Sequence, residues 1–246
     1  MQILRLLGLL GAAGVVAGIG GCLAHRKLLY FPSHDTAQTE LAPWQVNGEV
    51  VGFAVERKDP VAVWLMLHGN GGQASQRAYV LPRMSAADSL YVMEYPGYGA
   101  RPGSPSRAVF NAAATDALAA LRLRFPGKPM GVIGESIGSG PAAWLGSQLP
   151  APDKIVLVVP FDRLERVAKG KFPYLPVEWV LRDKWDNGAA LQDYGGELEI
   201  YGAADDQVIP LKHARDLAAQ LPRAKFTVLP GGHNAWSYQS ELRIAF

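Results

Sequence analysis

The chain contains one cysteine and no long run of a single charge in its 246 residues. One cysteine excludes a framework of disulfides and the multi-cysteine sets that hold structural zinc. With 24 Lys and Arg against 22 Asp and Glu, the net charge is only +2, so the charge balance gives no sign of a nucleic-acid partner. Neither a fixed-period repeat nor a low-complexity tract is present, which excludes a repeat architecture.

Apolar side chains are abundant instead. They make up 49% of the chain, against 19% for charged residues, which is the composition of a globular protein with a substantial core. The length is compatible with one large α/β domain.

The N-terminal region lacks charge altogether between Leu6 and Ala24. As a helix this run would be about 28 Å long, barely enough to span a bilayer. The lone Cys22 follows Ile19-Gly20-Gly21 at the point where a secretion signal would end, and this pattern resembles the lipobox of bacterial lipoproteins, whose cysteine is lipidated.

We therefore expect residues 1–27 to be a lipoprotein signal lipidated at Cys22, with an uncleaved signal anchor as the alternative and a cytoplasmic chain as the least favoured reading. The first two predict a membrane-associated, extracytoplasmic protein. The folded domain is then expected over residues 28–246.

Short apolar runs alternate with helical patterns through this domain. Near-continuous apolar runs suit strands buried on both faces of a parallel sheet, and they lie at 61–69, 90–95, 130–134, 154–161, 198–202 and 225–231. An alternating run at 49–57 favours an antiparallel edge strand, and helical spacing occurs at 105–125 and 210–221. This order predicts an α/β fold with a doubly wound, mostly parallel sheet and function at the carboxyl ends of the strands.

Ser136 lies at one such strand end, in the stretch Gly131–Gly146 that reads GVIGESIGSGPAAWLG. A G-x-S-x-G pattern between a strand and a helix is typical of a sharp turn that presents a nucleophilic serine. Glycine permits the unusual dihedrals and the close backbone approach that such a turn requires. A tight turn with a spectator serine is the alternative.

The acid that would assist Ser136 is expected after a later strand, where LEIYGAADDQVIP offers two adjacent aspartates. We favour Asp205, which lies three residues past Gly202. Asp206 remains the alternative, because it lies four residues before Pro210, another common spacing.

His233 is the candidate general base. It alone among five histidines follows both aspartates on a loop beyond a strand, whereas His68 and His213 have stronger structural explanations. A serine hydroxyl needs such a base to accept its proton, and a carboxylate to orient the imidazole. The order Ser136, aspartate, His233 is the one that α/β-hydrolases use.

Two backbone N–H groups are candidates for an oxyanion hole. The first belongs to Ile137, directly after the nucleophile, and the second to Asn70 in the loop HGNGGQ after the 61–69 strand. A flexible turn is the alternative for that loop.

These pieces together resemble the α/β-hydrolase-fold serine hydrolases, specifically a membrane-anchored subgroup of small, mostly lidless members. The matching motifs span residues 28–237 and are LLYFP, LHGNGG, EYPGYGARPGSPS, GESIGSG, LPVEWVLRDKWDN, GAADDQVIP and GGHN. The resemblance implies an α/β-hydrolase fold with a short insertion at about 162–197 instead of a large cap, and hydrolysis of a small-molecule carboxylic ester. It implies no metal and no organic cofactor.

Departures from the family pattern lie at residues 94–101, which we expect to wall the site and to influence substrate preference. The aromatic residues of the insertion, Phe172, Tyr174, Trp179 and Trp185, are candidates for an acyl pocket or for core packing. Two other functions stay open: a serine peptidase or amidase of the same fold, since GAADDQV also resembles the acid loop of prolyl-oligopeptidase-type enzymes, and a non-catalytic binding protein.

Overall fold

The structure is a computed structural model that describes Arg26, residues 29–35 and residues 39–246. Most of the described chain folds around a single eight-stranded sheet, with the order β1-β2-β4-β3-β5-β6-β7-β8. The strands are β1 (Ala42–Val46), β2 (Glu49–Val55), β3 (Val63–Leu67), β4 (Ser89–Met93), β5 (Met130–Glu135), β6 (Lys154–Val158), β7 (Glu197–Ala203) and β8 (Lys225–Leu229).

The sheet is parallel from β4 to β8, while β1 and β2 are antiparallel. This confirms the mostly parallel α/β sheet. The expected antiparallel strand at 49–57 is confirmed as β2, but its predicted edge position was wrong, because β1 pairs with β2 and takes the edge itself. The sequence APWQV of β1 gives little strand signal, since it contains a proline and a polar residue among five positions.

The apolar runs become strands because both faces of the sheet are covered. In β3, Val63, Leu65 and Leu67 belong to one apolar core, while Trp64 and Met66 belong to a second core on the opposite face. All five β3 residues are buried. Side chains alternate between the faces of a strand, so a strand buried on both sides must be apolar throughout.

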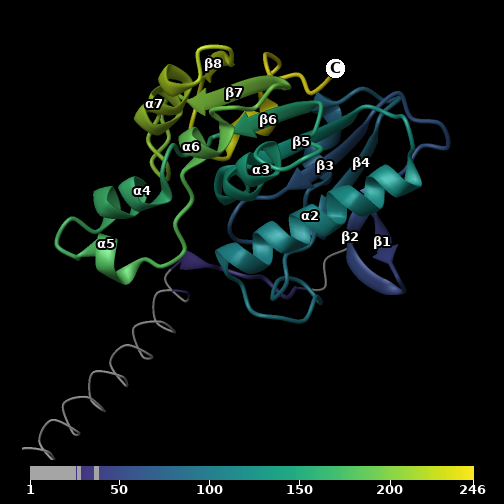
Figure 1. Cartoon of the computed structure of the whole chain (residues 1–246), viewed down its shortest axis with the longest axis horizontal. Coiled ribbons are helices and arrows are strands. Elements are labelled where there is room, and N and C mark those ends of the chain that lie inside the picture. The colour runs from purple at the N-terminus through teal and green to yellow at the C-terminus, as the bar shows by residue number, and fades with distance from the viewer. Residues whose placement is uncertain (1–25, 27–28, 36–38) are drawn as a thin grey trace, which may run out of the picture.

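Helices cover both faces, but the two layers differ. On one face lie α2 (Arg107–Arg124), α3 (Ser139–Gly146), α6 (Asn187–Leu191) and α7 (Lys212–Gln220). Among the described residues, the helices on the other face are the 3₁₀ helices η1 (Ala74–Gln76), η2 (Ala78–Arg83) and η4 (Ala235–Tyr238), and the C-terminal segment packs there too. Figure 1 shows α2 and α3 lying across the sheet.

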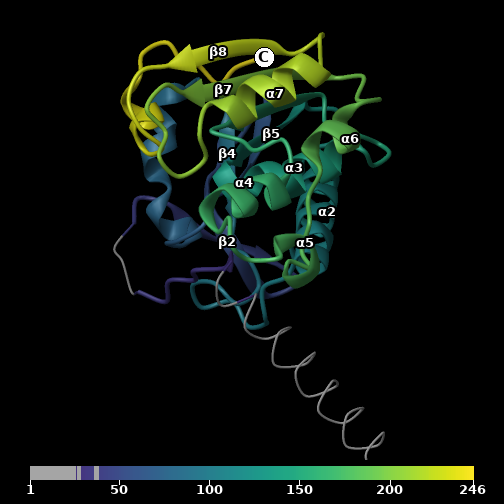
Figure 2. The same ribbon diagram turned by 90° about the vertical axis from the view of Figure 1, so that its left-hand side faces the viewer.

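The expected short insertion takes the place of a cap. It contains α4 (Leu164–Lys171) and α5 (Val177–Val180), and it continues into α6. In Figure 1, α4 and α5 lie beyond the ends toward which the arrows of β6 and β7 point, and Figure 2 views them from the front. The insertion therefore lies at the carboxyl end of the sheet, where the functional residues were expected.

The predictions for residues 1–27, including lipidation of Cys22, fall almost entirely outside the described residues. Within the described part of the chain, no helix combines the length and the apolar character needed to cross a bilayer.

Candidate active site

Ser136 occupies a strained turn between β5 and α3. Its φ angle is +53°, a left-handed conformation that costs a non-glycine residue free energy and is often retained for function. The single turn η3 (Ser136–Gly138) follows at once and leads into α3. The chain therefore reverses sharply and places the serine at the end of the strand.

The glycines on either side of Ser136 are required by close packing. A Cβ at Gly134 would lie 2.7 Å from the Cβ of Ala142, and one at Gly138 would overlap the carbonyl oxygen of Leu67 in β3. Real Cβ atoms do not approach so closely, so only glycine lets the turn fold back against its own helix and the neighbouring strand.

Buried hydrogen bonds stabilise the turn at Ser136. The hydroxyl of Ser139 donates to the carbonyl oxygen of Ser136 at 2.6 Å, and Asn187 donates to Ser139 Oγ at 3.0 Å and to the carbonyl of Phe161 at 2.8 Å. Since Asn187 begins α6, the insertion is tied to the turn that carries the serine.

His233 and Asp206 complete a hydrogen-bonded chain with Ser136. His233 Nε2 lies 3.0 Å from Ser136 Oγ, and Nδ1 lies 2.7 Å from Asp206 Oδ2. An ionised carboxylate only accepts hydrogen bonds, so Nδ1 carries the proton and Nε2 is left to accept from the serine hydroxyl. Three residues that lie far apart in the sequence thus meet in the geometry of a Ser-His-Asp triad.

The preference for Asp205 over Asp206 was wrong as regards contact with His233. The Asp205 residue is exposed, whereas Asp206 is 5% exposed and points inward. Asp206 Oδ1 accepts hydrogen bonds from the N–H groups of Val208 and Ile209, both at 2.8 Å, which leaves Oδ2 aimed at His233. The turn at Val208 and Ile209 therefore determines that Asp206, and not Asp205, contacts His233. In the sequence, the informative signal was the position of Asp206 four residues before Pro210.

The loop after β3 is tied to the residue next to the serine. The Glu135 carboxylate accepts from the N–H of Gly69 at 2.8 Å, from the hydroxyl of Tyr79 at 2.9 Å and from Trp236 Nε1 at 3.2 Å. Burial raises the pKa of Tyr79, and the adjacent Glu135 raises it further, so the phenol stays protonated and donates. Arg77 donates to the carbonyl of Gly71 in the same loop.

Asn70 connects this loop to the N-terminal segment. Its Oδ1 accepts from the N–H of Phe31 at 3.0 Å and from the hydroxyl of Tyr98 at 2.8 Å, while its Nδ2 donates to the carbonyl of Leu29 at 2.5 Å. The side-chain amide is thus engaged in structural bonds, which leaves the backbone N–H as the group that Asn70 could offer to a substrate.

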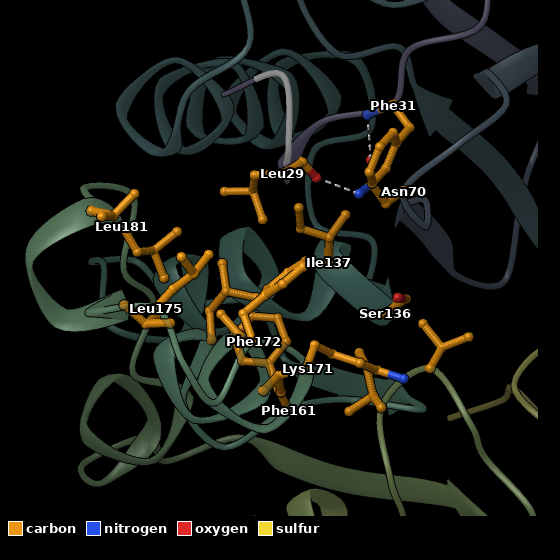
Figure 3. Close-up of a pocket in the computed structure, with 17 residues that line it drawn as sticks. Leu29, Phe31, Asn70, Ser136, Ile137, Phe161, Lys171, Phe172, Leu175 and Leu181 are labelled. Atoms are coloured by element: carbon orange, nitrogen blue, oxygen red, sulfur yellow. Dashed lines mark hydrogen bonds between the residues drawn. The ribbon is translucent and has the colours of Figure 1, made fainter. Parts of the chain in front are cut away.

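A cavity of about 230 Å³ opens beside Ser136, lined by Asn70, Ile137 and mainly apolar residues of the insertion. Figure 3 shows Ser136 at one end of this cavity and Leu175, Leu181 and Phe172 farther along it. The remaining apolar lining comes from Leu29, Phe31, Phe161, Leu164, Val167, Ala168, Val177, Val180, Val208 and Ile209. The site can therefore receive an apolar chain next to a hydroxyl.

Two expectations about the walls of the site need correction. Residues 94–101 do not line this cavity. Glu94 is buried instead, where it accepts from the N–H of Ala74 at 3.0 Å and faces His68 at 3.4 Å, so it supports the loop after β3.

Of the four aromatic candidates, only Phe172 lines the cavity. Trp185 packs in the core and donates to Asn111 Oδ1 at 3.0 Å. Tyr174 and Trp179 are 99% and 87% exposed.

Sequence reasoning missed the supporting residues Glu135, Tyr79 and Arg77. Of these three, only Glu135 could have been noticed in the sequence, because it is a charged residue directly before Ser136 at the end of an otherwise apolar strand. No group of three or more His, Cys, Asp or Glu side chains suited to a metal occurs among the described residues.

The fold and this site define the class of the protein: it is an α/β-hydrolase-fold protein similar to esterases and lipases. Its structure resembles that of the esterase Pf2001 from Pyrococcus furiosus, with a TM-score of 0.64, 15% identity and coverage of 85% of this chain and 95% of that one. A lipase-esterase related protein from Clostridium acetobutylicum has a TM-score of 0.58 at 12% identity, over 72% and 88% of the two chains. At these identities the likeness establishes the fold alone.

Sequence comparison gives the family. The chain is 30% identical over 243 residues to the uncharacterized protein Rv2307c of Mycobacterium tuberculosis, covering 91% of this chain and 84% of that protein. It belongs to the same family as this mycobacterial protein. No family model matches the chain.

A more distant similarity links the chain to lysophosphatidylserine lipase ABHD12. The zebrafish protein is 28% identical over 181 residues, and the mouse protein is 27% identical over 176 residues. These matches cover 64% and 63% of this chain but only 47% and 44% of the two lipases, so the chain corresponds to less than half of either one.

Proposed function

We propose that this protein is a serine hydrolase that cleaves carboxylic esters, with Ser136 as nucleophile, His233 as general base and Asp206 as the acid that orients it. The observation that carries the proposal is the continuous hydrogen-bonded chain from Asp206 through His233 to Ser136 at the mouth of an apolar cavity. A carboxylate-oriented imidazole next to a serine hydroxyl is the arrangement that acyl transfer requires.

In the first half of the reaction, Ser136 Oγ attacks the ester carbonyl while His233 Nε2 takes its proton. The negatively charged Asp206 stabilises the imidazolium that forms and keeps its Nδ1–H in place. Collapse of the tetrahedral intermediate transfers the proton from Nε2 to the departing alcohol and leaves an acyl-enzyme on Ser136. Water, deprotonated by His233, then releases the acid and restores the serine.

The oxyanion of each intermediate would be stabilised by the backbone N–H groups of Ile137 and Asn70. Support comes from their position, because both line the cavity at Ser136. The bond from Gly69 to Glu135 and the engaged side chain of Asn70 fix this loop before substrate arrives. Such preorganisation avoids a reorganisation cost during reaction, and loss of one donor typically costs about 3–4 kcal/mol.

The substrate is proposed to be an ester with an apolar acyl chain. The apolar lining of the cavity supports this class, and the similarity to ABHD12, a lysophosphatidylserine lipase, points to the same kind of bond. We further propose membrane attachment on the extracytoplasmic side through residues 1–27, supported by the uncharged run and by Cys22.

Labelling with a fluorophosphonate tests the nucleophile. The wild-type protein is expected to react and Ser136→Ala to lose all labelling, while Ser147→Ala, which changes an exposed serine after α3, serves as the matched control. Unchanged labelling of Ser136→Ala would reject the assignment.

A panel of p-nitrophenyl esters of increasing acyl length, set against aminoacyl anilides, tests the bond. Ester hydrolysis that rises with acyl length is the expected result, since each buried methylene contributes about 0.8 kcal/mol. Preference for the anilides would instead favour a peptidase, and a fully inert protein would favour a non-catalytic binding role.

A further inference from the structure

Large apolar side chains are exposed among the residues that line the cavity and beside them in the chain: Tyr174 lies between Phe172 and Leu175, and Trp179 lies between Val177 and Val180. Tyr174 is 99% exposed and Trp179 87% exposed, and Phe31, Phe172, Leu175 and Val180 are each at least 40% exposed. We call these six residues the apolar rim. Exposed aromatic groups of this size cost free energy in water unless another surface covers them.

The rim is continuous with the cavity at Ser136. Phe31, Phe172, Leu175 and Val180 line that cavity while also reaching the surface, so the apolar lining runs from the serine outward. Figure 3 shows Phe31 on one side of the cavity, with Phe172 and Leu175 across from it. An apolar chain could therefore follow a mainly apolar lining from the rim to Ser136, with Lys171 and Asn70 as the polar side chains among the lining residues other than Ser136 itself.

Ion pairs and hydrogen bonds fix the position of the insertion that carries most of the rim. Lys169 and Glu178 form an ion pair at 2.7 Å that connects α4 to α5, and Lys184 donates to the carbonyl of Glu178 at 2.9 Å. Lys171 donates to the carbonyl of Gln207, which lies in the loop next to Asp206. The insertion therefore presents its aromatic groups from a braced position beside the triad.

The N-terminal segment reaches the fold at the same place. Leu29 and Phe31 line the cavity, and the Tyr30 hydroxyl donates at 3.0 Å to Asp183, which follows α5 within the insertion. The uncharged run that ends at Ala24 lies only five residues before Leu29. At no more than about 3.6 Å per residue, the end of that run can lie no farther than about 18 Å from the rim side of the cavity.

We propose that the apolar rim docks into a lipid bilayer, so that the hydrolase draws its ester substrate from the membrane directly into the cavity. Tyr174 and Trp179 enter the interfacial region, where amphipathic rings are favoured, and the acyl chain of a lipid passes along Phe172 and Leu175 toward Ser136. The substrate class rests on the proposed ester hydrolysis, whereas the docking geometry does not.

The depth of Trp179 tests the docking. The full-length chain is reconstituted in phosphatidylcholine vesicles with a fraction of phosphatidylglycerol, some of them with lipids brominated near the glycerol end of the acyl chains. The fluorescence difference between wild type and Trp179→Phe isolates one of the six tryptophans. We expect this difference to be quenched strongly by the bromolipid, because docked segments lie about 5–10 Å into the headgroup boundary.

Ser136→Ala is expected to show the same quenching, so failure of the hydrolase assignment leaves this readout intact. Absence of quenching of the Trp179 signal would overturn the docking. So would a size shift from dimer to monomer in detergent on changing Tyr174 and Trp179, because it would assign the rim to a second copy of the chain.

Kinetics provide the second arm. Tyr174→Ser combined with Trp179→Ser is expected to lower hydrolysis of a long-chain ester embedded in vesicles about ten-fold, a loss that corresponds to one decade of partitioning. Hydrolysis of a soluble short-chain ester should stay unchanged. An equal fall on both substrates would overturn the proposal, since it would mean that the rim serves the site itself.

Leu123→Ser combined with Leu149→Ser is the matched control, because these residues are 85% and 95% exposed and lie near the opposite ends of the strands, Leu123 in the last turn of α2 and Leu149 after α3. It should leave both activities and the Trp179 signal unchanged. A fall in vesicle activity equal to that of the rim variant would count against a specific docking surface.

Discussion

Two aspartate–histidine pairs of the same length lie beyond neighbouring strands of the sheet. Asp162 follows β6 and lies 2.7 Å from His213 Nδ1, while Asp206 follows β7 and lies 2.7 Å from His233 Nδ1. Only the second pair contacts a serine, since His233 Nε2 lies 3.0 Å from Ser136 Oγ.

The surroundings of the two pairs explain their different uses. The side chains of Asp162 and His213 are 1% and 2% exposed, and Arg166 forms an ion pair with Asp162 and with Asp216 of α7. That cluster joins α4 to α7. His233 is 12% exposed and lies on a loop at the cavity. An aspartate–histidine pair is thus a structural connection unless the second ring nitrogen meets a nucleophile at an accessible site.

Removal of the proposed nucleophile should have the largest effect on activity. Ser136→Ala is expected to lower kcat for a p-nitrophenyl ester by about 10⁶-fold, as in serine hydrolases whose nucleophile is removed. The melting temperature should hold or rise, because the residue at the strained turn contributes no side-chain bond other than that to His233. Ester assays and thermal unfolding together check this, and retained turnover would contradict it.

Neutralising the acid of the catalytic pair should have the next largest effect. Asp206→Asn is expected to lower kcat by about 10⁴-fold, because the amide no longer stabilises the imidazolium or holds its tautomer. Asn retains an oxygen that can accept from the N–H groups of Val208 and Ile209, so the loop should stay folded. A circular-dichroism melt controls for folding, and near-normal kcat would show that Asp206 has no catalytic role.

The structural pair should respond in the opposite way. Asp162→Asn is expected to lower the free energy of unfolding by about 1.5–3 kcal/mol, the contribution of hydrogen bonds to a charged group. The kcat of the folded protein should change little, because Asp162 does not contact Ser136, His233 or Asp206. Denaturant unfolding and ester kinetics check the two halves, and a loss of kcat without loss of stability would erase the distinction between the pairs.

Acid titration sharpens the same distinction. Burial raises the pKa of the Asp162 carboxyl. Hydrogen bonds from His213, the Arg163 N–H and Arg166 together lower it by more, so the pKa lies below its ordinary 3.8. A depressed pKa in the folded state stabilises the protein above pH 3.8, and this stabilisation is lost as the pH falls through the folded value. We expect the stability of Asp162→Asn to depend less on pH in this acid range than that of wild type, and identical acid profiles would refute this.

The smallest effect is expected at the neighbouring aspartate. Asp205→Asn should change kcat by less than about two-fold, as exposed substitutions away from special features usually do. Its side chain is exposed, and its backbone N–H, which donates to the Gly231 carbonyl at 2.9 Å, is retained in the variant. A fall as large as that of Asp206→Asn would show that the two aspartates exchange roles in solution.

The sheet could be predicted because strands buried on both faces leave uninterrupted apolar runs. Ser136 and His233 could be predicted because each follows such a run on a short, glycine-rich turn. The choice between Asp205 and Asp206 could not be made with the same certainty, since it depends on which side chain folds back to accept from Val208 and Ile209.

Other features depend on contacts between distant segments. The position of β1 at the edge follows from pairing with β2, and the support of the loop after β3 by Glu135 and Tyr79 follows from tertiary packing. The exposure of Tyr174 and Trp179 could not be predicted either, because aromatic residues in an insertion are compatible with a core as well as with a surface.

A crystal structure of the protein inactivated by a long-chain alkyl phosphonate tests the central claim most directly. We predict a covalent bond from phosphorus to Ser136 Oγ, with the phosphonyl oxygen about 3 Å from the N–H groups of Ile137 and Asn70 and the alkyl chain in the cavity beside Phe172. An adduct on another residue, or an alkyl chain that lies outside the cavity with the phosphonyl oxygen facing solvent, would contradict the account.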